Sequence, residues 1–394
     1  MKNALEGVRV LEYTHVISGS YCGMLLGDLG ADVIKMERPD VGEFYREEAL
    51  KNADGISLVY PNYNRNKKGI TLNLKHEKAK EITLKLVENC DIFIENYRPG
   101  LLKKMGLGYE DLKKVNPKLI MVSISGFGQT GPYKDKPAYD MTISAMSGFM
   151  SMNGPEGVPT KNGPAISDFL SGIYGALGAI AALRRCEKTG EGEFIDVSLM
   201  ECAMSVLDAF FAQSRFTGVE PRATGNRRQN YAPVNSFTTK DGHVYIACSL
   251  EKHWDILTRL MNRRDLYDHP KFVTTKQRKE NEDEVEGIVE EWTKQFTTKE
   301  LLDMFDASGM PCAPIQSINE VLNDPHVKER NAIVEIEYPG LGPYPVVALP
   351  AKFKNMKTPM ASAPELGQHN ELVYQELLGF TKQEFDKMVE DKLI

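Results

Sequence analysis

The order of short apolar strands and helices near the start of the chain is the feature that most restricts its fold. Residues 8–13 (VRVLEY) have the composition of a strand, residues 20–29 are typical of a helix, and residues 31–37 (ADVIKME) return to a strand. Two strands joined in this way lie parallel in one sheet, with a right-handed crossover. The opening of the chain therefore predicts a βαβ unit.

The same alternation continues over the first half of the chain. Helices are predicted at 76–89, 169–185 and 200–215, and further strands at 91–95, 119–125 and 194–199. Alternating strands and helices are typical of an α/β fold with a doubly wound, mostly parallel sheet. We therefore expect a Rossmann-like large domain, whose first part covers residues 1–216.

The composition changes at residues 217–232, which are polar and basic and are interpreted as a linker. Residues 233–316 are predicted to form a smaller α+β domain. It contains a hairpin at 236–249, turned by Asp241-Gly242, and amphipathic helices at 251–261, 280–296 and 298–307. Residues 317–394 contain a second linker, two short strands and two closing helices.

Composition disfavours several classes of protein. A net charge of −7 argues against nucleic acid as the main partner, which would require a dominant basic face. Six scattered cysteines without CxxC spacing favour a reducing cytoplasm over a disulfide framework or zinc site. The histidines form no metal-binding pattern, so no metal is expected. We expect no signal peptide, and the longest apolar run, at 169–183, is too short to span a membrane.

The first βα turn, from Thr14 to Gly19, has no GxGxxG pattern, which disfavours a nicotinamide or flavin cofactor. Arg38 follows the second strand, where doubly wound folds contact a ribose or its phosphate. An arginine there suits the 3′-phospho-ADP of coenzyme A, although taken alone it is more typical of a solvated turn. Other cations, expected on loops at the carboxyl ends of strands, are candidates for a pyrophosphate site. They are Lys67, Lys68, Lys75, Arg98, Lys103 and Lys104.

Asp168 stands in the segment PAISDFLSG, immediately before the helix predicted at residue 169. Taken locally, this position favours a helix cap, in which the carboxylate accepts a backbone N–H. A carboxylate at a helix N-terminus is also expected to stay ionised, because the helix dipole stabilises its charge. An ionised carboxylate is the form required for nucleophilic attack on a thioester. The cap and the nucleophile are therefore compatible interpretations.

Several segments, taken in order, resemble the family III CoA-transferases, the group that includes formyl-CoA, carnitine and bile-acid CoA-transferases. They include residues 11–39 (LEYTHVISGSYCGMLLGDLGADVIKMERP), 91–100 (DIFIENYRPG), 166–183 (ISDFLSGIYGALGAIAAL) and 310–326 (MPCAPIQSINEVLNDPH). The resemblance implies a Rossmann-like large domain built from both parts of the chain, an inserted small domain, and two ring-shaped subunits interlocked as a homodimer.

The resemblance also assigns roles to residues. It implies that Asp168 is the nucleophile, attacking an acyl-CoA to give a mixed anhydride and then an aspartyl-CoA thioester. Coenzyme A and acyl-CoA are substrates, together with small carboxylic acids, and no permanently bound cofactor is expected. The implied coenzyme A contacts are Val16, Ile17, Ser18, Arg38, Leu72, Lys75, Asn96, Tyr97, Lys104 and Met105. The implied acyl pocket includes His15, Tyr139 and Asp140.

Two alternatives stay open. A 2-methylacyl-CoA racemase shares the fold, but it needs a second acid–base group, and Tyr139 stands where those relatives have a histidine. The ordinary pKa of tyrosine, about 10, makes it a poor base at neutral pH. A CoA-binding homologue without turnover is the other alternative. A glycine run that formyl-CoA transferases carry is missing near Gly225, which disfavours formyl-CoA and oxalate as substrates.

Overall fold

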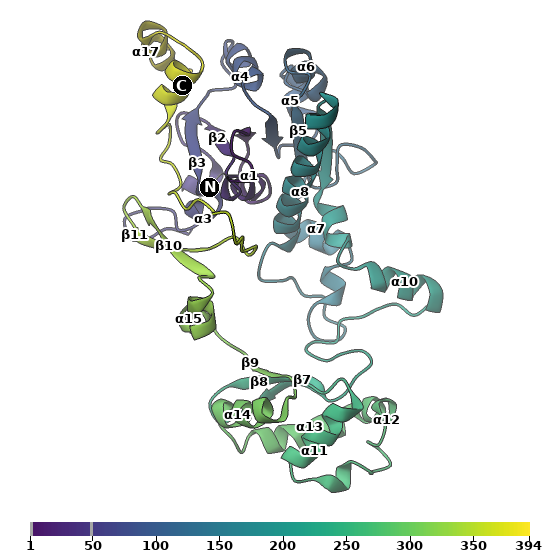
Figure 1. Ribbon diagram of the computed structural model, residues 1–394. Helices are drawn as coiled ribbons and strands as arrows, with labels where there is room; N and C mark the ends of the chain where they lie inside the picture. The colour runs from purple at the N-terminus through teal and green to yellow at the C-terminus, as the bar shows by residue number, and fades with distance from the viewer. Residues whose placement is uncertain (1–2, 48–49) are drawn as a thin grey trace. The chain divides into compact units, whose positions relative to one another are not determined.

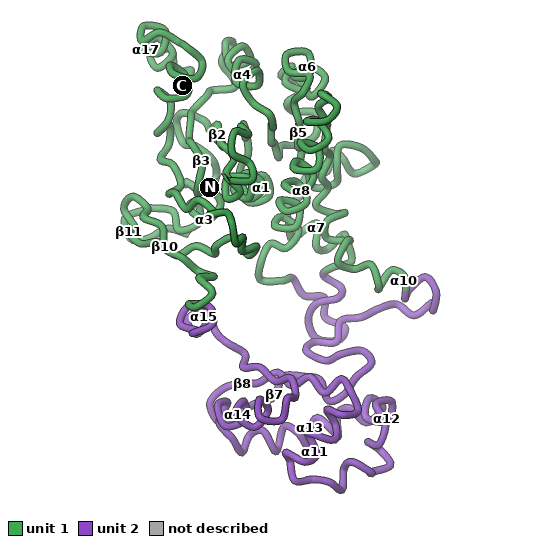
Figure 2. The backbone as a smooth tube through the Cα atoms, in the orientation of Figure 1, with its two compact units in different colours: residues 1–149, 162–212, 328–394 green, residues 150–161, 213–327 purple. Residues whose placement is uncertain are grey.

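The computed structural model shown in Figure 1 describes residues 3–47 and 50–394. The chain forms two compact units (Figure 2). Unit 1 holds residues 1–149, 162–212 and 328–394, and unit 2 holds residues 150–161 and 213–327. The chain therefore enters unit 2 twice, and unit 1 contains segments from both sides of it in the sequence.

Unit 1 is built on a six-stranded parallel sheet with the order β3-β2-β1-β4-β5-β6. The strands are β1 (Arg9–Tyr13), β2 (Asp32–Glu37), β3 (Lys67–Thr71), β4 (Ile92–Glu95), β5 (Ile120–Ser125) and β6 (Glu193–Ser198). This is the strand order of doubly wound nucleotide-binding folds, so the predicted α/β class is confirmed. The order reverses between β1 and β4, which places the loops after these strands at the edge where such folds bind ligands.

Successive residues of the central strands enter opposite cores, because side chains alternate across a sheet. Val10 and Ile92 belong to a core with α1 (Ser18–Asp28) and α8 (Ile166–Thr189). Leu11 and Phe93 belong to a core with α4 (Ala79–Glu88), α6 (Tyr109–Val115) and α17 (Lys382–Glu390). Both faces are therefore covered, which explains why these strands read as almost continuous apolar runs.

The other elements of unit 1 are shorter. A hairpin of β10 (Ile333–Tyr338) and β11 (Gly342–Val347) forms a small core with Tyr60. The short helices are α2 (Phe44–Glu47), α3 (Tyr60–Asn64), α5 (Leu101–Lys104), α7 (Asp140–Met146) and α9 (Leu199–Met204), with a π-helical turn at Leu372–Leu377.

The single helix predicted at 200–215 is wrong, because the structure has two helices there, α9 and α10 (Asp208–Thr217). The Ser205 hydroxyl donates to the Cys202 carbonyl (2.7 Å), and the Asp208 carboxylate accepts the N–H of Ala209 (2.6 Å). Short polar side chains that bond to the nearby backbone in this way end and start helices.

Unit 2 has a three-stranded antiparallel sheet of β7 (Val234–Thr238), β8 (His243–Ala247) and β9 (Cys312–Pro314). Its core contains Trp254, Trp292 and Phe305. The helices are α11 (Glu251–Leu260), α12 (Thr275–Glu280), α13 (Glu282–Thr293), α14 (Thr298–Ser308) and α15 (Ile318–Asn323), with 3₁₀ turns at Met150–Met152 and Arg264–Leu266. One more helix, α16 (Pro325–Glu329), spans the boundary to unit 1.

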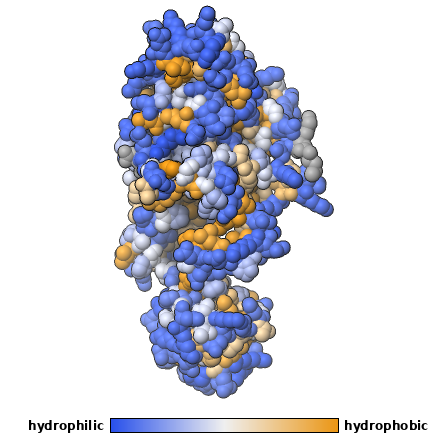
Figure 3. Space-filling view, turned by 90° about the vertical axis from the view of Figure 1, so that its left-hand side faces the viewer, coloured by the Kyte–Doolittle hydropathy of each residue, from blue (hydrophilic) through white to orange (hydrophobic). Residues whose placement is uncertain are grey.

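On the side of the molecule drawn in Figure 3, hydrophilic residues cover most of the surface, with apolar patches between them. Among the described residues, α8 is the one helix long and apolar enough to cross a membrane. Its Ala176 and Ala179 are buried in the core with α1, so its composition reflects packing inside unit 1. The opposite face of α8 exposes Tyr174 and Leu177.

Helices α1 and α8 approach closely at Gly172. A Cβ atom at this residue would lie 2.9 Å from the Ser18 carbonyl oxygen and 3.2 Å from the Cys22 nitrogen. Both are backbone atoms, so the contact can be relieved only by moving a helix. Glycine is therefore required for the observed packing of α8 on the start of α1.

Gly172→Ala is expected to lower the free energy of unfolding of unit 1 by about 1–3 kcal/mol, because the added methyl group overpacks the helix contact. The matched control is Gly287→Ala in α13, where nothing lies within 4 Å of the added atom. That variant is expected to be unchanged or up to about 1 kcal/mol more stable, since alanine favours a helix. Urea unfolding followed by circular dichroism measures both variants. An equal effect in the two would contradict the packing argument.

Candidate active site

The loop after β1 lies where the strand order reverses, and Asn96, directly after β4, holds it. The amide nitrogen of Asn96 donates to the His15 carbonyl (2.8 Å) and to the Ser18 hydroxyl (3.0 Å). Its amide oxygen accepts the His15 N–H (3.0 Å). One side chain thereby joins the ends of the two strands that flank the reversal, where a ligand crevice is expected.

The predicted contacts Val16, Ile17 and Ser18 form the turn that leads from this loop into α1. Val16 has a left-handed backbone with φ 60°, and its N–H donates to the buried carboxylate of Glu43 (3.0 Å). Ile17 is buried and directly precedes the helix, with no side-chain cap. The turn is therefore held by partners from two other segments of unit 1.

A cavity of about 630 Å³ opens at the carboxyl ends of β2 and β3. Three cations line it, Arg38 after β2, Lys75 after β3 and Lys392 after α17, against one side-chain carboxylate, Asp40. Tyr13 and Ile394 supply an apolar part of the wall. Positive charge beside an apolar wall suits a phosphorylated nucleotide. Lys392 was missed by the sequence analysis, because nothing local indicates that the closing helix returns to this edge.

A second cavity, of about 370 Å³, is lined by His15, Asn96 and Tyr97, among other residues. The Tyr13 and Tyr97 rings stack with centroids 4.6 Å apart, and His15 meets Tyr97 edge-on at 4.7 Å. Because Tyr13 lines the first cavity and Tyr97 lines the second, this aromatic stack stands at the wall of both. Lys134 also lines the second cavity. It lies in the loop after β5, so it could have been predicted as a loop cation at the carboxyl end of a strand, like the others.

His15 is uncharged at neutral pH. Burial lowers its pKa to about 4, and the nearby positive charges of Lys35 and Arg38 act in the same direction. A neutral imidazole donates at one nitrogen and accepts at the other. His15 is therefore suited to hydrogen bonding with a ligand and not to providing positive charge.

Asp168 occupies the third position of α8, since the helix begins at Ile166 after an N-cap at Ala165. The predicted cap role of Asp168 is therefore wrong. Asp140, at the start of α7, takes it instead: its Oδ1 accepts the N–H (2.8 Å) and the hydroxyl (2.6 Å) of Ser167. Gly172 lies one turn beyond Asp168 on the same face of α8 and packs on Ser18. Asp168 therefore lies on the face of α8 that packs on the start of α1.

The Asp168 carboxyl is half-buried, and its pKa is raised to about 7. Burial is the main cause, and the negative charge of Asp140 adds to it. The expectation that the helix dipole keeps this group fully ionised is therefore wrong. At neutral pH, protonated and ionised forms coexist, and the ionised form is a more basic carboxylate than an ordinary aspartate.

Aromatic side chains surround the start of α8. Phe169 meets Tyr21 edge-on at 5.1 Å and Tyr63 at 6.0 Å, and Tyr63 stacks on Tyr45 at 5.9 Å. Burial raises the pKa of Tyr63 to about 12, and the charge of Asp168 contributes, as it does for Tyr45. Asp168 therefore lies near both phenols. This wall was not predicted, because Tyr45 and Tyr63 lie in segments without a recognisable motif.

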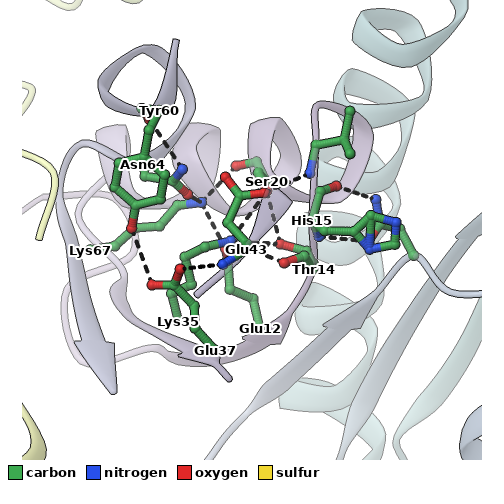
Figure 4. A network of polar contacts seen from close by, with 12 residues as sticks. Glu12, Thr14, His15, Ser20, Lys35, Glu37, Glu43, Tyr60, Asn64 and Lys67 are labelled. Atoms are coloured by element: carbon green, nitrogen blue, oxygen red, sulfur yellow. Dashed lines mark hydrogen bonds and ion pairs between the residues drawn. The ribbon is translucent and has the colours of Figure 1, made fainter. Parts of the chain in front are cut away.

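A buried ion cluster lies beneath the turn (Figure 4). The Lys67 ammonium donates to Glu12 (2.8 Å), to the Ser20 carbonyl (2.8 Å) and to Asn64 (2.9 Å), and Lys35 also donates to Glu12 (3.1 Å). Burial lowers the pKa of Lys67 to about 8. The prediction of Lys67 as a loop cation is wrong, since it is buried at the start of β3.

Of the other predicted residues, all but Arg98 and Tyr139 lie apart from the two cavities. Lys68 is in β3 and pairs with Asp32 (2.7 Å), so its prediction as a loop cation is also wrong. Leu72 is fully buried in the core, Met105 packs against the same core, and Lys104 is exposed on α5. The Tyr139 side chain is exposed, directly before α7, and lines the second cavity.

The model of CoA-transferase family III matches residues 5–370, which is most of the chain. The protein belongs to this family and is a CoA-transferase, as the sequence analysis predicted. The succinyl-CoA–D-citramalate CoA-transferase of Chloroflexus aurantiacus is 35% identical over 99% of this chain and 98% of its own length. The human succinyl-CoA:glutarate CoA-transferase is 36% identical over 95% of this chain and 86% of its own length.

Solved structures agree with the fold. The crystal structure of a CAIB/BAIF family protein from Brucella suis matches with a TM-score of 0.88 and 32% identity, covering 96% of this chain and all of that one. The doubly wound architecture of unit 1 is therefore that of a known family of proteins.

The rate of CoA transfer is expected to rise with pH through about 7, as Asp168 loses its proton. Asp140→Asn removes a negative charge but keeps an oxygen that can accept the Ser167 N–H. It is expected to shift the rising limb of kcat/KM to lower pH, because the ionised form of Asp168 is then less disfavoured. The exposed Asp135, changed to Asn, is the matched control. A rising limb that stays in place in Asp140→Asn would contradict the electrostatic assignment.

Proposed function

We propose that this enzyme moves coenzyme A from an acyl-CoA donor to a carboxylic acid acceptor through covalent intermediates on Asp168. The observation that carries the proposal is the placement of Asp168. This basic, half-buried carboxylate lies on the face of α8 that packs on the turn at the strand reversal, and Tyr13, in the strand before that turn, lines the cation-lined cavity. The family and its named relatives support the same activity.

The ionised Asp168 attacks the thioester carbonyl, a C–O bond forms, and the C–S bond breaks. This step gives a mixed anhydride and free CoA thiolate. The thiolate then attacks the aspartyl carbonyl and releases the donor acid, leaving an aspartyl-CoA thioester. An acceptor carboxylate reverses the two steps and regenerates Asp168. Atoms and charge balance without an oxidant, a reductant or a further cofactor.

The cavity beside Arg38, Lys75 and Lys392 is proposed to hold the phosphorylated nucleotide of coenzyme A. The pantetheine arm then passes the aromatic stack toward the turn at Val16, whose residues are coenzyme A contacts by the sequence resemblance. A neutral His15 offers the arm hydrogen bonds without attracting its phosphates. Lys104 and the Leu72 side chain line neither cavity, so any contact they make with coenzyme A needs the backbone or a rearranged side chain.

We infer that the substrates are short dicarboxylic acids and their CoA thioesters. The similar proteins are named for succinyl-CoA together with citramalate or glutarate. The phenols of Tyr45 and Tyr63 near Asp168 offer hydroxyl donors beside an apolar wall. Tyr139 stands where racemases have a histidine, so deuterium exchange at the α-carbon without CoA transfer would contradict the proposal. The interlocked homodimer stays a prediction.

Asp168→Ala is expected to lower the rate of CoA transfer by at least about 10⁴-fold, because the nucleophile is lost, while CoA affinity changes little. Asp168→Asn is expected to be inactive but more stable than the wild type above pH 7. The raised pKa means that ionisation of Asp168 disfavours the fold as pH rises through about 7. A succinyl-CoA and glutarate exchange assay, calorimetry with CoA and thermal unfolding measure the three effects. Near-wild-type transfer by Asp168→Ala would exclude the mechanism.

Lys392→Ala is expected to weaken binding of coenzyme A by about 10-fold, and to weaken binding of dephospho-CoA less, if Lys392 contacts the 3′-phosphate. Lys387→Ala, in α17 directly before Lys392, is the matched control, because Lys387 does not line the cavity. Calorimetric titration with both ligands gives the ratio. Equal weakening for coenzyme A and dephospho-CoA would place the 3′-phosphate elsewhere.

A further inference from the structure

The turn that leads into α1 contains a strained residue. Val16 has φ 60°, and the other non-glycine residues with positive φ in the described chain are three asparagines and a lysine. A left-handed backbone costs an L-residue roughly 1–2 kcal/mol, and a branched Cβ makes it a true outlier. Such a conformation persists only where the surroundings determine it from several sides.

Two side chains hold the turn. Asn96 holds the residues on either side, by its three hydrogen bonds to His15 and Ser18. Glu43 holds the strained residue itself, because its Oε2 accepts the Val16 N–H at 3.0 Å. Asn96 contacts are expected in this family, whereas Glu43 was not indicated by any motif.

Glu43 is itself fixed from behind. Its backbone N–H donates to Glu37 Oε1 (3.0 Å), and Glu37 is held by two hydrogen bonds from Arg46 (2.8 Å each). Figure 4 shows Glu43 beside the turn, with Glu37 and Lys35 nearby. A series of buried polar contacts therefore runs from Arg46 through Glu37 and Glu43 to Val16.

Burial of the second carboxylate oxygen of Glu43 costs free energy of folding. Glu43 is only 6% exposed, and its Oε1 has no hydrogen-bond partner among the described residues. A buried polar atom without a partner costs about 1–3 kcal/mol. Strain at Val16 and an unsatisfied oxygen at Glu43 thus occur on the two sides of one hydrogen bond. Unfavourable features of this kind concentrate at functional sites.

The hydrogen bond between Glu43 and Val16 is linked to Asp168 by one contact between helices α1 and α8. Val16 and Ile17 lead directly into α1, and the Ser18 carbonyl packs on Gly172, one turn beyond Asp168. A change of φ at Val16 therefore moves the turn relative to Asp168. Misplacement by about 1 Å costs roughly 100-fold in rate when reacting groups must be aligned.

We propose that Glu43 is a positioning residue whose carboxylate holds Val16 in its left-handed conformation and so fixes the turn of residues 16–18 against Asp168 and the bound thioester. The inference rests on the proposed CoA transfer and adds a residue to it. Glu43 contacts no reacting atom; it acts through the backbone of Val16.

The test compares Glu43→Leu with Glu43→Gln in the full-length enzyme. Glu43→Leu removes the acceptor and is expected to lower kcat/KM for CoA transfer by about 100-fold. Glu43→Gln keeps an oxygen in reach of the Val16 N–H and is expected to stay within about 5-fold of wild type. Asp28→Asn is the stability control, because Asp28 is a buried carboxylate of α1 that pairs with Arg65 and does not contact the turn. Its kcat/KM per folded molecule is expected to stay within about 2-fold.

A double-mutant cycle separates positioning from a general structural role. Glycine adopts a left-handed backbone without strain, so Val16→Gly weakens the need for Glu43. Glu43→Leu is expected to cost at least about 10-fold less in the Val16→Gly background than in the wild type. An equal loss in both backgrounds, or wild-type kcat/KM in Glu43→Leu, would overturn the proposal.

Hydrogen exchange gives a readout that does not depend on activity. Glu43→Leu is expected to speed amide exchange in a peptide covering residues 14–20, while Asp28→Asn leaves that peptide unchanged. If the wild type transfers no CoA yet this exchange effect is present, the proposed function fails and the structural part of the inference stands. Unchanged exchange in Glu43→Leu would reject the contact itself.

Discussion

The carboxylate of Glu12 is the group on which the edge of the sheet that carries the site depends. It accepts hydrogen bonds from two ammonium groups, Lys35 on β2 and Lys67 on β3, and so links three neighbouring strands. All three side chains are fully buried. Removing one member of such a cluster leaves an uncompensated charge, which typically costs 3–5 kcal/mol. A Cβ atom at Gly23 would collide with this carboxylate, so the glycine in α1 is part of the same arrangement.

The electrostatics of Asp168 suit the nucleophilic role proposed for it. A carboxylate with a pKa near 7 is more basic than an ordinary aspartate and is therefore a better nucleophile toward a carbonyl. In the proposed mechanism the basic Asp168 is also the poorer leaving group of the mixed anhydride, so attack by the thiolate expels the donor carboxylate more readily than Asp168. The neighbouring Asp140 serves two purposes, because it caps α8 and it raises the basicity of Asp168.

The sequence predicted the repeating strands and the class of fold, because a strand buried on both faces must be apolar along its length. The resemblance also named the turn after β1 and Asn96, which the structure places on the two sides of the reversal of strand order. Prediction from the sequence failed where a long-range partner decides the outcome. Asp168 reads locally as a cap, but the cap is Asp140, which precedes it in the chain by a whole helix and loop. Lys67 reads as an exposed loop lysine, but its partner, Glu12, lies two strands away in the sheet. Tyr45 and Tyr63 are recognised as part of the site only because they lie near Asp168 in the folded chain.

The cation-lined cavity is formed by residues that are translated at very different times. Tyr13, Arg38 and Lys75 precede unit 2 in the sequence, whereas Lys392 follows it. During synthesis, the sheet of unit 1 can therefore assemble while this cavity still lacks one wall. The nascent chain cannot form the complete cavity before the whole of unit 2 has been translated. A ribosome-bound intermediate would thus present a folded sheet with an open edge, and the ligand would meet a complete cavity only after unit 2 exists.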